Sequence, residues 1–288
     1  MPQLLDIDIQ TKEVLDWKGV HLMHMMMSSC SQKTRIFLNL KGVPWESHDI
    51  KDIPGGNWGE WFLGINPRGL VPVLIHDGAV HIESNDILLY LDKNFSGPAL
   101  IPSGKEIELE HLLKQEDDLH LDLRALSIRY MFGVEMALRD DERLKAYRDT
   151  GSGTVQGKAD NDKLAQIEFW QTLRKDGITD DRVKLAVNNF RQVFERFEET
   201  LSEQPYLLGS DITLIDIAWY IYTNRLNIVG YPFAKLHPNV DAWFHKLNAR
   251  KDFAKECITP PFIQPHVEAL KTKNEADGTT LSLVAGIE

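Results

Sequence analysis

The chain has 288 residues, of which 43% are hydrophobic and 26% charged, enough to bury the core of one or two domains. Its 43 acidic residues outnumber its 32 basic residues, so the formal net charge is −11. There is no basic field to hold phosphates, and nucleic acids and membranes are poor candidates as partners. No apolar run approaches a membrane span, and residues 1–20 lack a signal-peptide pattern. The two cysteines, Cys30 and Cys257, do not make a disulfide framework, and we expect a reducing, cytoplasmic compartment.

The first hundred residues alternate between strand and helix patterns. Residues 1–18 are polar and mixed, and we expect an N-terminal extension there. Residues 19–97 then read as strand, helix, strand, helix, strand, strand and helix, which is the order of a thioredoxin-like α/β domain. These elements are expected near residues 19–27, 29–41, 45–50, 58–63, 70–75, 80–82 and 84–92.

The start of the first helix is where such a fold places its chemistry, because free amides and the helix dipole favour an anion there. A redox member would have Cys-x-x-Cys at this point, whereas this chain has Ser28-Ser29-Cys30-Ser31, so dithiol–disulfide cycling is not expected. A Ser28 hydroxyl that donates a hydrogen bond to a bound thiolate would lower that thiol's pKa from about 8.5 toward neutrality. Cys30 is either a working thiol or a small apolar residue in the first helical turn.

A hairpin followed by a helix start occupies the end of this domain. Pro72 lies in an apolar run and cannot donate to a sheet ladder, so it must begin a strand, lie on an edge or sit in a kink. After an Asp-Gly turn, Ser84 or Asn85 is expected to cap a helix. These pieces suit a small peptide that pairs its backbone with Val71 and places its ammonium at Glu83 and its carboxylate on the helix amides. An ordinary hairpin and helix cap is the alternative.

The amino-acid sequence of residues 66–92 resembles that of the glutathione-binding domain in the cytosolic glutathione transferases, and the omega and zeta classes are the most similar. The resemblance implies that Pro72 follows a cis peptide bond and that Val71 pairs its backbone with the cysteinyl part of glutathione. It also implies that Glu83 and Ser84 hold the γ-glutamyl end. One departure concerns the glycyl end, since Ile65 stands where the omega class has a lysine. Other candidates for that end are Lys51, Asn57 and Trp58.

The residues around Ser28 extend this resemblance. The run at 28–31 is similar to the zeta-class motif, which implies that Ser28 activates glutathione and that Cys30 assists. In register with the omega class, Ser28 stands where that class has its disulfide-forming cysteine, which points away from thioltransferase chemistry. Cys30 also resembles the nucleophile of the zeta-like reductive dehalogenases, so a glutathione-consuming dehalogenation is an alternative.

The second part of the chain reads as helical. Residues 98–104 are rich in proline and glycine and are expected to be a linker, and apolar residues then recur at helical spacing over residues 105–258. Thr213 and Asp216 form a capping box, similar to the one that the transferases place in the core helix of their second domain. The middle, about 135–195, is longer than usual and resembles the glutathione-dependent β-aryl ether-cleaving enzymes. Residues 259–288 are a tail without an assignment.

We expect no metal site in this chain. His21 and His24 lie three apart in a strand and so point to opposite faces of the sheet. His120 shares a helical face with Glu116 and with Asp117, but there is no second carboxylate–histidine set to complete a two-metal site.

These features predict the glutathione transferase fold, an α/β N-terminal thioredoxin-like domain followed by an all-α C-terminal helical domain. The resemblance implies an enzyme that uses glutathione as cosubstrate and activates its thiol for attack on an apolar electrophile. The resemblance implies a two-fold homodimer, and Met27, Tyr130 and Tyr222 are candidates for the apolar wall. Two alternatives differ in class. One is a glutathione-dependent β-ether lyase or reductive dehalogenase that uses Cys30, and the other is a non-catalytic interaction module that keeps the fold.

Overall fold

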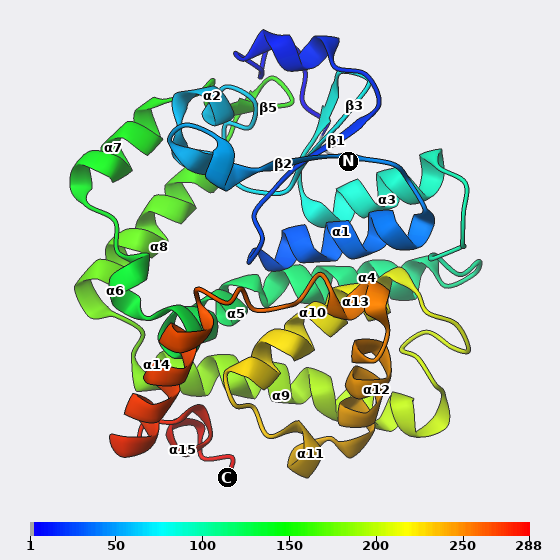
Figure 1. The fold of residues 1–288 in the computed structure, drawn as a ribbon, viewed down its shortest axis with the longest axis vertical. Helices are drawn as coiled ribbons and strands as arrows, with labels where there is room; N and C mark the ends of the chain where they lie inside the picture. Colours follow the sequence, from blue (N-terminus) through cyan, green and yellow to red (C-terminus); the bar gives the residue numbers. More distant parts are fainter. Residues whose placement is uncertain (1–2) are drawn as a thin grey trace. The chain divides into compact units, whose positions relative to one another are not determined.

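The computed structural model describes residues 3–288, and the chain divides into two compact units. The first contains the chain up to residue 98 together with residues 139–174. The second contains residues 99–138 and 175–288. All named strands belong to the first unit, and the second is built of helices, which confirms the predicted fold class (Figure 1).

A four-stranded sheet with the order β2-β1-β3-β4 forms the centre of the first unit. Its strands are β1 (Val20–His24), β2 (Glu46–Asp49), β3 (Val73–His76) and β4 (Ala79–His81). β1 runs parallel to β2 and antiparallel to β3, and β4 runs antiparallel to β3. Helices α1 (Ser29–Lys41) and α3 (Ser84–Asn94) pack side by side on one face. The turns η2 (Ile50–Asp52) and η3 (Gly56–Trp58) and helix α2 (Glu60–Leu63) connect β2 to β3.

Local sequence explains most of these elements. Every residue of β1 is buried, as expected for a central strand that is covered on both faces. Pro72 directly precedes the first residue of β3, where its missing N–H removes no ladder hydrogen bond. The cap of α3 differs from the prediction, because Glu83 occupies the N-cap position and Ser84 is the first helical residue.

The N-terminal extension is folded onto the sheet. It contains the turn η1 (Lys12–Asp16), and Leu4, Ile9 and Val14 are buried with the sheet residues on the face that α2 also covers. Asp8 is fully buried, and its Oδ1 accepts hydrogen bonds from Thr154 Oγ1 at 2.6 Å and from the Gly157 amide at 2.9 Å. The extension is thereby tied to a segment that lies far along the chain.

That segment, residues 139–174, belongs to the first compact unit, whereas the predicted boundaries assigned it to the helical domain. It contains α7 (Asp141–Asp149), the hairpin of β5 (Thr154–Val155) and β6 (Lys158–Ala159), and most of α8 (Asp162–Asp176). We call residues 139–174 the insert. Its contacts to residues 57–69 are aromatic and ionic.

The second unit is a set of packed helices. They are α4 (Glu106–Asp118), α5 (His120–Ser127), the π-helical turn η4 (Ile128–Phe132), α6 (Val134–Ala137), α9 (Asp180–Glu203), α10 (Leu214–Ile228), α11 (Phe233–Leu236), α12 (Pro238–Asn248), α13 (Lys251–Ala254), α14 (Gln264–Ala276) and α15 (Leu281–Ala285). Helix α10 is buried along nearly its whole length and packs on α4, α5 and α12. The C-terminal tail is folded, since α14 packs on η4 and α15 on α9.

The predicted capping box starts the central helix α10. The Asp216 carboxylate accepts hydrogen bonds from the Thr213 amide and hydroxyl at 2.9 and 2.8 Å. Its other oxygen accepts from the Leu207 amide and from Trp243 Nε1, both at 3.0 Å. Burial raises the pKa of Asp216, and these four hydrogen bonds act against that rise. This carboxylate therefore fastens the loop before α10, its first turn and α12 at one buried point.

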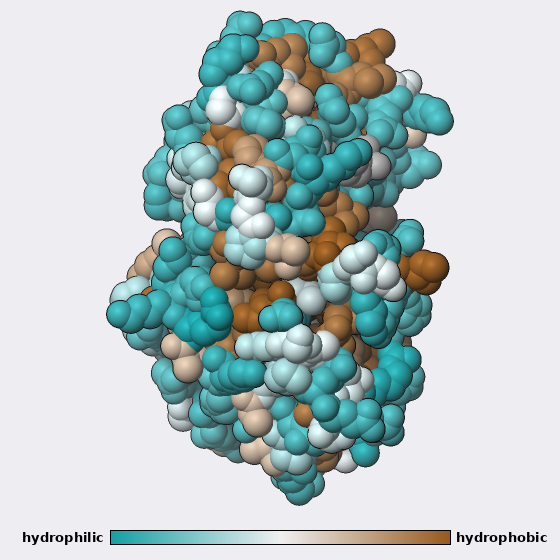
Figure 2. All heavy atoms as spheres, turned by 90° about the vertical axis from the view of Figure 1, so that its right-hand side faces the viewer, coloured by the Kyte–Doolittle hydropathy of each residue, from teal (hydrophilic) through white to brown (hydrophobic). Residues whose placement is uncertain are grey.

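The visible surface is mainly polar, as expected for a chain in which 26% of the residues are charged. Figure 2 shows a face on which hydrophilic side chains predominate and apolar atoms show as patches between them. Within residues 3–288, no helix combines the length and the apolar character that crossing a bilayer requires.

Candidate functional site

Ser28 caps the first helix, as the sequence predicts for a residue at this point. It is the N-cap of α1, with extended backbone at φ −72° and ψ 123°, and its Oγ accepts a hydrogen bond from the Ser31 amide at 3.3 Å. Because that contact uses only an acceptor lone pair, the hydroxyl proton can still be donated to a ligand. Ser28 is half-buried, so part of the residue remains open to solvent.

Arg35 holds the loop that leads into Ser28. Its guanidinium donates hydrogen bonds to the carbonyls of Met25 and Met26 at 3.3 and 3.2 Å. Arg35 is buried, and it approaches His24 Nδ1 at 3.3 Å. Both loop carbonyls therefore point toward the Arg35 guanidinium. An anion is favoured instead at the amino end of α1, where the backbone amides and the helix dipole carry partial positive charge.

Cys30 lies in the first turn of α1, two residues after Ser28. Its side chain is half-buried and it is not part of a disulfide. Its carbonyl accepts a hydrogen bond from Thr34 Oγ1 at 3.0 Å, within the helix. A thiol in a first helical turn benefits from the helix dipole, which favours the thiolate. The structure therefore places both predicted reactive groups, the hydroxyl and the thiol, at one helix end.

The sheet register brings the other predicted residues to the same end of the sheet. Met23, near the carboxyl end of β1, pairs with Val73, the first residue of β3, so Val71 and Pro72 lie beside the point where β1 leads into Ser28. The peptide bond between Val71 and Pro72 is cis, as the resemblance implies. In β4, His81 pairs with Leu74, so β4 ends where β3 begins. Residues that follow β4 therefore lie beyond this same end.

Glu83 and Ser84 follow β4 at the amino end of α3. Glu83 has a positive φ of 66°, a conformation that a non-glycine residue adopts only when its surroundings impose it and that recurs at functional sites. Its carbonyl accepts from the Ile87 amide at 2.9 Å, and its side chain remains 42% exposed. Ser84 is buried. An amino helix end with an accessible carboxylate beside it can hold both ends of an α-amino acid.

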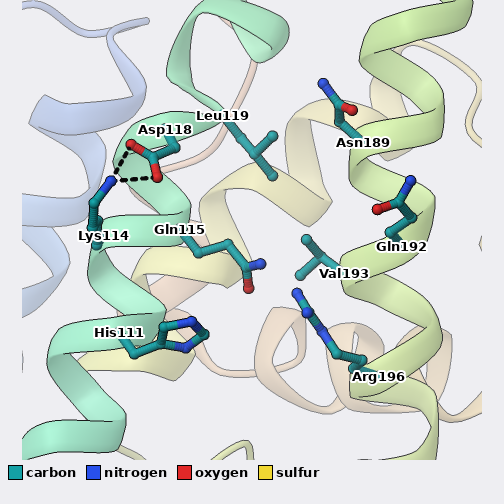
Figure 3. A pocket seen from close by; sticks show the side chains of 9 residues that line it. All are labelled: His111, Lys114, Gln115, Asp118, Leu119, Asn189, Gln192, Val193 and Arg196. Atoms are coloured by element: carbon teal, nitrogen blue, oxygen red, sulfur yellow. Dashed lines mark hydrogen bonds and ion pairs between the residues drawn. The ribbon is translucent and has the colours of Figure 1, made fainter.

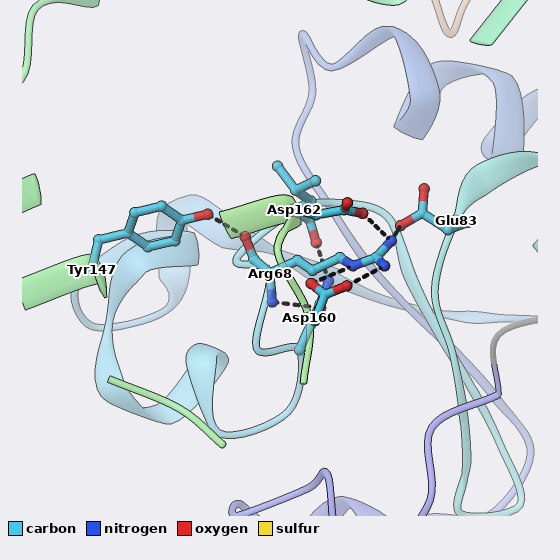
Figure 4. A network of polar contacts seen from close by, with 7 residues as sticks. Arg68, Glu83, Tyr147, Asp160 and Asp162 are labelled. Atoms are coloured by element: carbon cyan, nitrogen blue, oxygen red, sulfur yellow. Dashed lines mark hydrogen bonds and ion pairs between the residues drawn. The ribbon is translucent and has the colours of Figure 1, made fainter. Parts of the chain in front are cut away.

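The Glu83 carboxylate takes part in an ionic network centred on Arg68 (Figure 4). Arg68 Nη1 lies 2.6 Å from Glu83 Oε1 and 2.7 Å from Asp162 Oδ2. The other side of the guanidinium binds Asp160 through two parallel hydrogen bonds of 3.0 and 2.7 Å. Sequence reasoning missed this network, because Asp160 and Asp162 belong to the insert.

The network has an excess of negative charge. Burial acts to lower the pKa of Arg68, but the hydrogen bonds that Arg68 donates to Asp160 and the charges of Glu83 and Asp162 outweigh it, so its pKa is raised and it stays a cation. One guanidinium thus faces three carboxylates, those of Glu83, Asp160 and Asp162. The carboxylates of Glu83 and Asp162 are 42% and 52% exposed, which leaves them able to attract a cationic group from solvent.

Contacts from Tyr147 and Asn57 hold the backbone at Arg68 and Gly69. The Tyr147 hydroxyl donates to the Arg68 carbonyl at 2.5 Å, and the Tyr147 ring stacks on Trp58 at 4.2 Å with an interplanar angle of 6°. A Cβ at Gly69 would lie 2.8 Å from the Tyr147 ring, so glycine is required for this approach. Asn57 Nδ2 donates to the Gly69 carbonyl at 2.6 Å.

These contacts bear on the candidates for the glycyl end of glutathione. The side chains of Asn57 and Trp58 are engaged in holding the insert and the Gly69 turn. Lys51 is 65% exposed, although it pairs with Asp52 at 2.6 Å. It is therefore the most accessible of the three candidates, because Asn57 and Trp58 are half-buried. Arg139 and Arg143 lie over the Trp58 ring at 5.7 and 5.6 Å, as cation–π contacts.

Of the three residues proposed for an apolar wall, the half-buried Met27 lies in the first unit, and Tyr130 and Tyr222 lie in the second unit. Tyr222 is buried in the helical core, with its hydroxyl 3.1 Å from His120 Nδ1. Tyr130 lies in the π-helical turn η4, a local geometry frequent at functional sites. Its hydroxyl is buried without a hydrogen-bond partner, and burial raises its pKa to about 12.

A groove of about 440 Å³ runs between α4 and α9 (Figure 3). It is lined mainly by polar side chains, among them His111, Gln115 and Arg196, and an ion pair of 2.6 Å joins Lys114 to Asp118 at its rim. It contains none of the residues predicted to bind glutathione, so we do not assign the site to it.

Comparisons with known proteins identify the family of the chain and agree with its fold. Residues 27–94 match the family model of the glutathione S-transferase N-terminal domain, and residues 169–251 match that of the C-terminal domain. The chain is 28% identical over 236 residues to "Glutathione S-transferase hmp2" of Hypomyces subiculosus, covering 80% of this chain and 95% of that protein. It is 22% identical to the tetrachloro-p-hydroquinone reductive dehalogenase of Sphingobium chlorophenolicum, covering 84% of this chain and 96% of that protein.

A solved structure is similar over most of the chain. The β-etherase LigF from Sphingobium sp. strain SYK-6 superimposes with a TM-score of 0.67 at 25% identity, covering 83% of this chain and 98% of LigF. In sequence, LigF is 28% identical over 221 residues, covering 73% of this chain and 82% of LigF. The likeness therefore extends over both units.

Proposed function

The chain belongs to the glutathione transferase family and is a glutathione-dependent enzyme, and from this premise we propose that Ser28 is the residue that activates the glutathione thiol. The Ser28 hydroxyl, with its proton free to donate, stabilises the glutathione thiolate at the amino end of α1. The thiolate then attacks an electrophilic carbon of the second substrate, forming a carbon–sulfur bond and expelling a leaving group. The observation that carries this proposal is the placement of Ser28, Val71 and Glu83 beyond one end of the sheet.

Glutathione binds, in this proposal, beyond the end of the sheet at which β3 begins, beside the start of α3. The Val71 backbone pairs with the cysteinyl part, in the manner of a strand added to a sheet. Glu83 and Ser84 hold the γ-glutamyl end. The excess negative charge around Arg68 supports this assignment, because the γ-glutamyl end carries an ammonium that Glu83 and Asp162 would attract. Arg68 keeps Glu83 in place and is therefore a positioning residue.

The second substrate is proposed to be a small apolar electrophile. The family resemblance supports this idea, because an activated glutathione thiolate is a nucleophile that reacts with electrophilic carbon. A homodimer is proposed from the family, in which two-fold assembly is the expected symmetry. A reducing compartment such as the cytoplasm is proposed because neither Cys30 nor Cys257 takes part in a disulfide bond.

In a second proposed mechanism, Cys30 is the reactive residue. The similarity to the β-etherase LigF and to a reductive dehalogenase favours it, and Cys30 lies in the same helical turn as Ser28. In a dehalogenation of this kind, glutathione is first added to the substrate in place of halide. The Cys30 thiolate then attacks the sulfur of that adduct, which forms a mixed disulfide and breaks the carbon–sulfur bond. The released carbon keeps the electron pair of that bond and takes up a proton from water. A further glutathione thiolate would free Cys30 and yield glutathione disulfide, so the electrons balance.

Difference absorbance of the glutathione thiolate against pH separates these readings. The wild type should hold bound thiolate well below pH 8, and Ser28→Ala should raise the thiol pKa by at least about one unit, worth about 1.4 kcal/mol. Ser29→Ala removes a hydroxyl one residue away and is the matched control, for which no shift is expected. If Ser28→Ala keeps the wild-type thiolate while Cys30→Ser loses turnover with an electrophile, Ser28 is not the activator and the Cys30 reading replaces it.

Binding itself is measured separately by calorimetry. Glutathione should bind to the wild type, Ser28→Ala and Cys30→Ser with similar affinity, because the proposed peptide contacts lie at Val71, Glu83 and Ser84. If no binding is seen at millimolar glutathione, the proposed site is wrong and the fold serves as an interaction module.

A further inference from the structure

Two histidines and a glutamate converge at the edge of the sheet, away from the proposed glutathione site. His21 is in β1, and its register partner in the parallel strand β2 is Glu46. His48 lies two residues after Glu46 and so projects from the same face. His24 faces the other way, where its Nε2 lies 2.7 Å from Ser47 Oγ. The expectation that His21 and His24 point to opposite faces is confirmed, and the partners of His21 come from the neighbouring strand.

The separations between the three groups suit a metal ion. His21 Nδ1 lies 3.1 Å from His48 Nε2 and 3.5 Å from a Glu46 oxygen, and His48 Nε2 lies 3.7 Å from the other Glu46 oxygen. A tetrahedral zinc ion with bonds of about 2.0 to 2.2 Å has ligand atoms about 3.3 to 3.6 Å apart. Among the residues that the structure describes, this is the one group of three such side chains whose ligand atoms all lie within 4.8 Å of one another.

The surroundings of His21 orient it as a ligand. His21 Nε2 lies 2.8 Å from the Lys18 carbonyl oxygen, which can only accept, so Nε2 carries the proton and Nδ1 presents its lone pair to the cluster. A metal-binding histidine commonly has such a carbonyl partner on its other nitrogen. Trp17 packs on both rings, with centroid distances of 4.7 Å to His21 and 4.7 Å to His48. The N-terminal extension thus provides both the orienting carbonyl and an aromatic cover.

We propose that His21 Nδ1, His48 Nε2 and the Glu46 carboxylate bind one divalent transition-metal ion, with Zn²⁺ the best match and water completing the coordination. Imidazole and carboxylate ligands together select such ions over Mg²⁺ or Ca²⁺. Glu46 is 66% exposed, so the ion can enter from solvent, while the two imidazoles are 10% and 23% exposed.

Without the ion, a hydrogen bond takes its place. Because His21 Nδ1 is unprotonated, the proton between the rings belongs to His48 Nε2, which donates it to His21. Metal binding requires His48 to move this proton to Nδ1, with no net charge change in the ring.

The position of the cluster makes it a structural site. His21 lies toward the amino end of β1, whereas Ser28 follows the carboxyl end of the same strand. An ion here would join β1 and β2 and, through Lys18 and Trp17, hold the N-terminal extension against the sheet. It would therefore stabilise the first unit and take no part in the thiol chemistry.

Titration with Co²⁺ and Zn²⁺ tests the proposal on the full-length chain. All proteins carry Cys30→Ser, so that the thiol cannot bind the metal. The reference protein should bind one equivalent of Co²⁺ with visible absorption typical of low-coordinate cobalt, and Zn²⁺ should displace it. His48→Gln and Glu46→Gln should each weaken binding at least tenfold to a hundredfold, the loss that changes to outer-shell partners alone can produce. His245→Gln, which alters an exposed histidine 3.7 Å from Asp241, is the matched control and should leave binding unchanged.

Two further measurements keep the test decisive. Bound Co²⁺ should quench the fluorescence of Trp17, so Trp17→Phe should reduce the quenching while leaving the stoichiometry at one. Glu46 is exposed, so Glu46→Gln should fold like the reference even if a histidine variant does not. The proposal is wrong if the reference protein does not bind Zn²⁺ or Co²⁺ at submillimolar concentration. It is equally wrong if Glu46→Gln and His48→Gln bind the ion as tightly as His245→Gln.

Discussion

Arg68 offers the sharpest test of how the insert supports the proposed glutathione site. The substitution Arg68→Met keeps most of the side-chain length and removes the charge and all the hydrogen bonds to Asp160, Glu83 and Asp162. Asp160 would then be a carboxylate with a side chain only 13% exposed and without its bidentate partner. The other two carboxylates, which are about half exposed, can be hydrated instead.

The size of the effect follows from this difference in burial. Removing one member of a buried ion pair costs about 3–5 kcal/mol, because the remaining charge is left uncompensated. Asp160 retains some contact with solvent, so the lower end, about 3 kcal/mol, applies to it. Each pair with Glu83 or Asp162 adds at most about 0.5 kcal/mol, as partly exposed pairs do. We therefore expect Arg68→Met to lower the free energy of unfolding of the first unit by about 3–4 kcal/mol.

Equilibrium urea unfolding measures this loss, and two variants calibrate it. Arg68→Lys keeps the charge but cannot make two parallel hydrogen bonds, so it should lose about 1–2 kcal/mol. Arg148→Met removes an exposed arginine of the insert that pairs with Asp149, and it should unfold at the same urea concentration as the wild type. A double-mutant cycle of Arg68→Met with Asp160→Asn should give a coupling energy of at least about 1 kcal/mol. A loss below about 1 kcal/mol for Arg68→Met, or a coupling near zero, would refute the argument.

Three further predictions concern single buried groups. Asp8→Asn should cost about 1–2 kcal/mol at pH 7, measured by urea unfolding. Burial acts to raise the pKa of Asp8, but its hydrogen bonds outweigh this and lower it, so the stabilisation is present above its unfolded pKa of about 3.9 and is lost as pH falls through the folded value. The cost of Asp8→Asn should accordingly shrink below about pH 4; a constant cost would contradict this. Asp216→Ala should cost at least about 3 kcal/mol by thermal or urea unfolding, because it strands buried donors such as Trp243 Nε1. Arg35→Met should release the Met25 and Met26 carbonyls and reduce glutathione-dependent turnover at least about tenfold, and an unchanged rate would show that the loop needs no such support.

Local patterns predicted the parts of the fold that depend on neighbouring residues. The strand and helix order of the first unit follows from periodicity, Pro72 lies at the start of a strand, and the capping box of Thr213 and Asp216 is present as the spacing indicated. The placement of Ser28 at the amino end of α1 follows for the same reason, since an N-cap is determined by the residues of one helical turn.

Contacts that join distant parts of the chain could not be predicted in this way. Arg68 and Asp160 are separated by 92 residues, and neither carries a local signal that it pairs with the other. The grouping of His21 with His48 depends on which strands become neighbours and in which register they pair. From the sequence alone, the nearest histidine to His21 is His24 in the same strand, and it points to the other face of the sheet. The helical cap at Glu83 was missed because its positive φ is imposed by the surrounding structure and not by residue preference.

The N-terminal extension and the insert act on the first unit together. Asp8 ties the extension to the hairpin of the insert, and Arg68 ties the insert to Glu83 at the proposed glutathione site. A change in the hairpin that loosens Asp160 would free Arg68 to move with it. The Glu83 carboxylate would then lose the charge that positions it, although no residue in contact with glutathione had changed. Glutathione affinity in this chain should therefore depend on a segment whose sequence lies about seventy residues beyond the nearest predicted binding residue, Ser84.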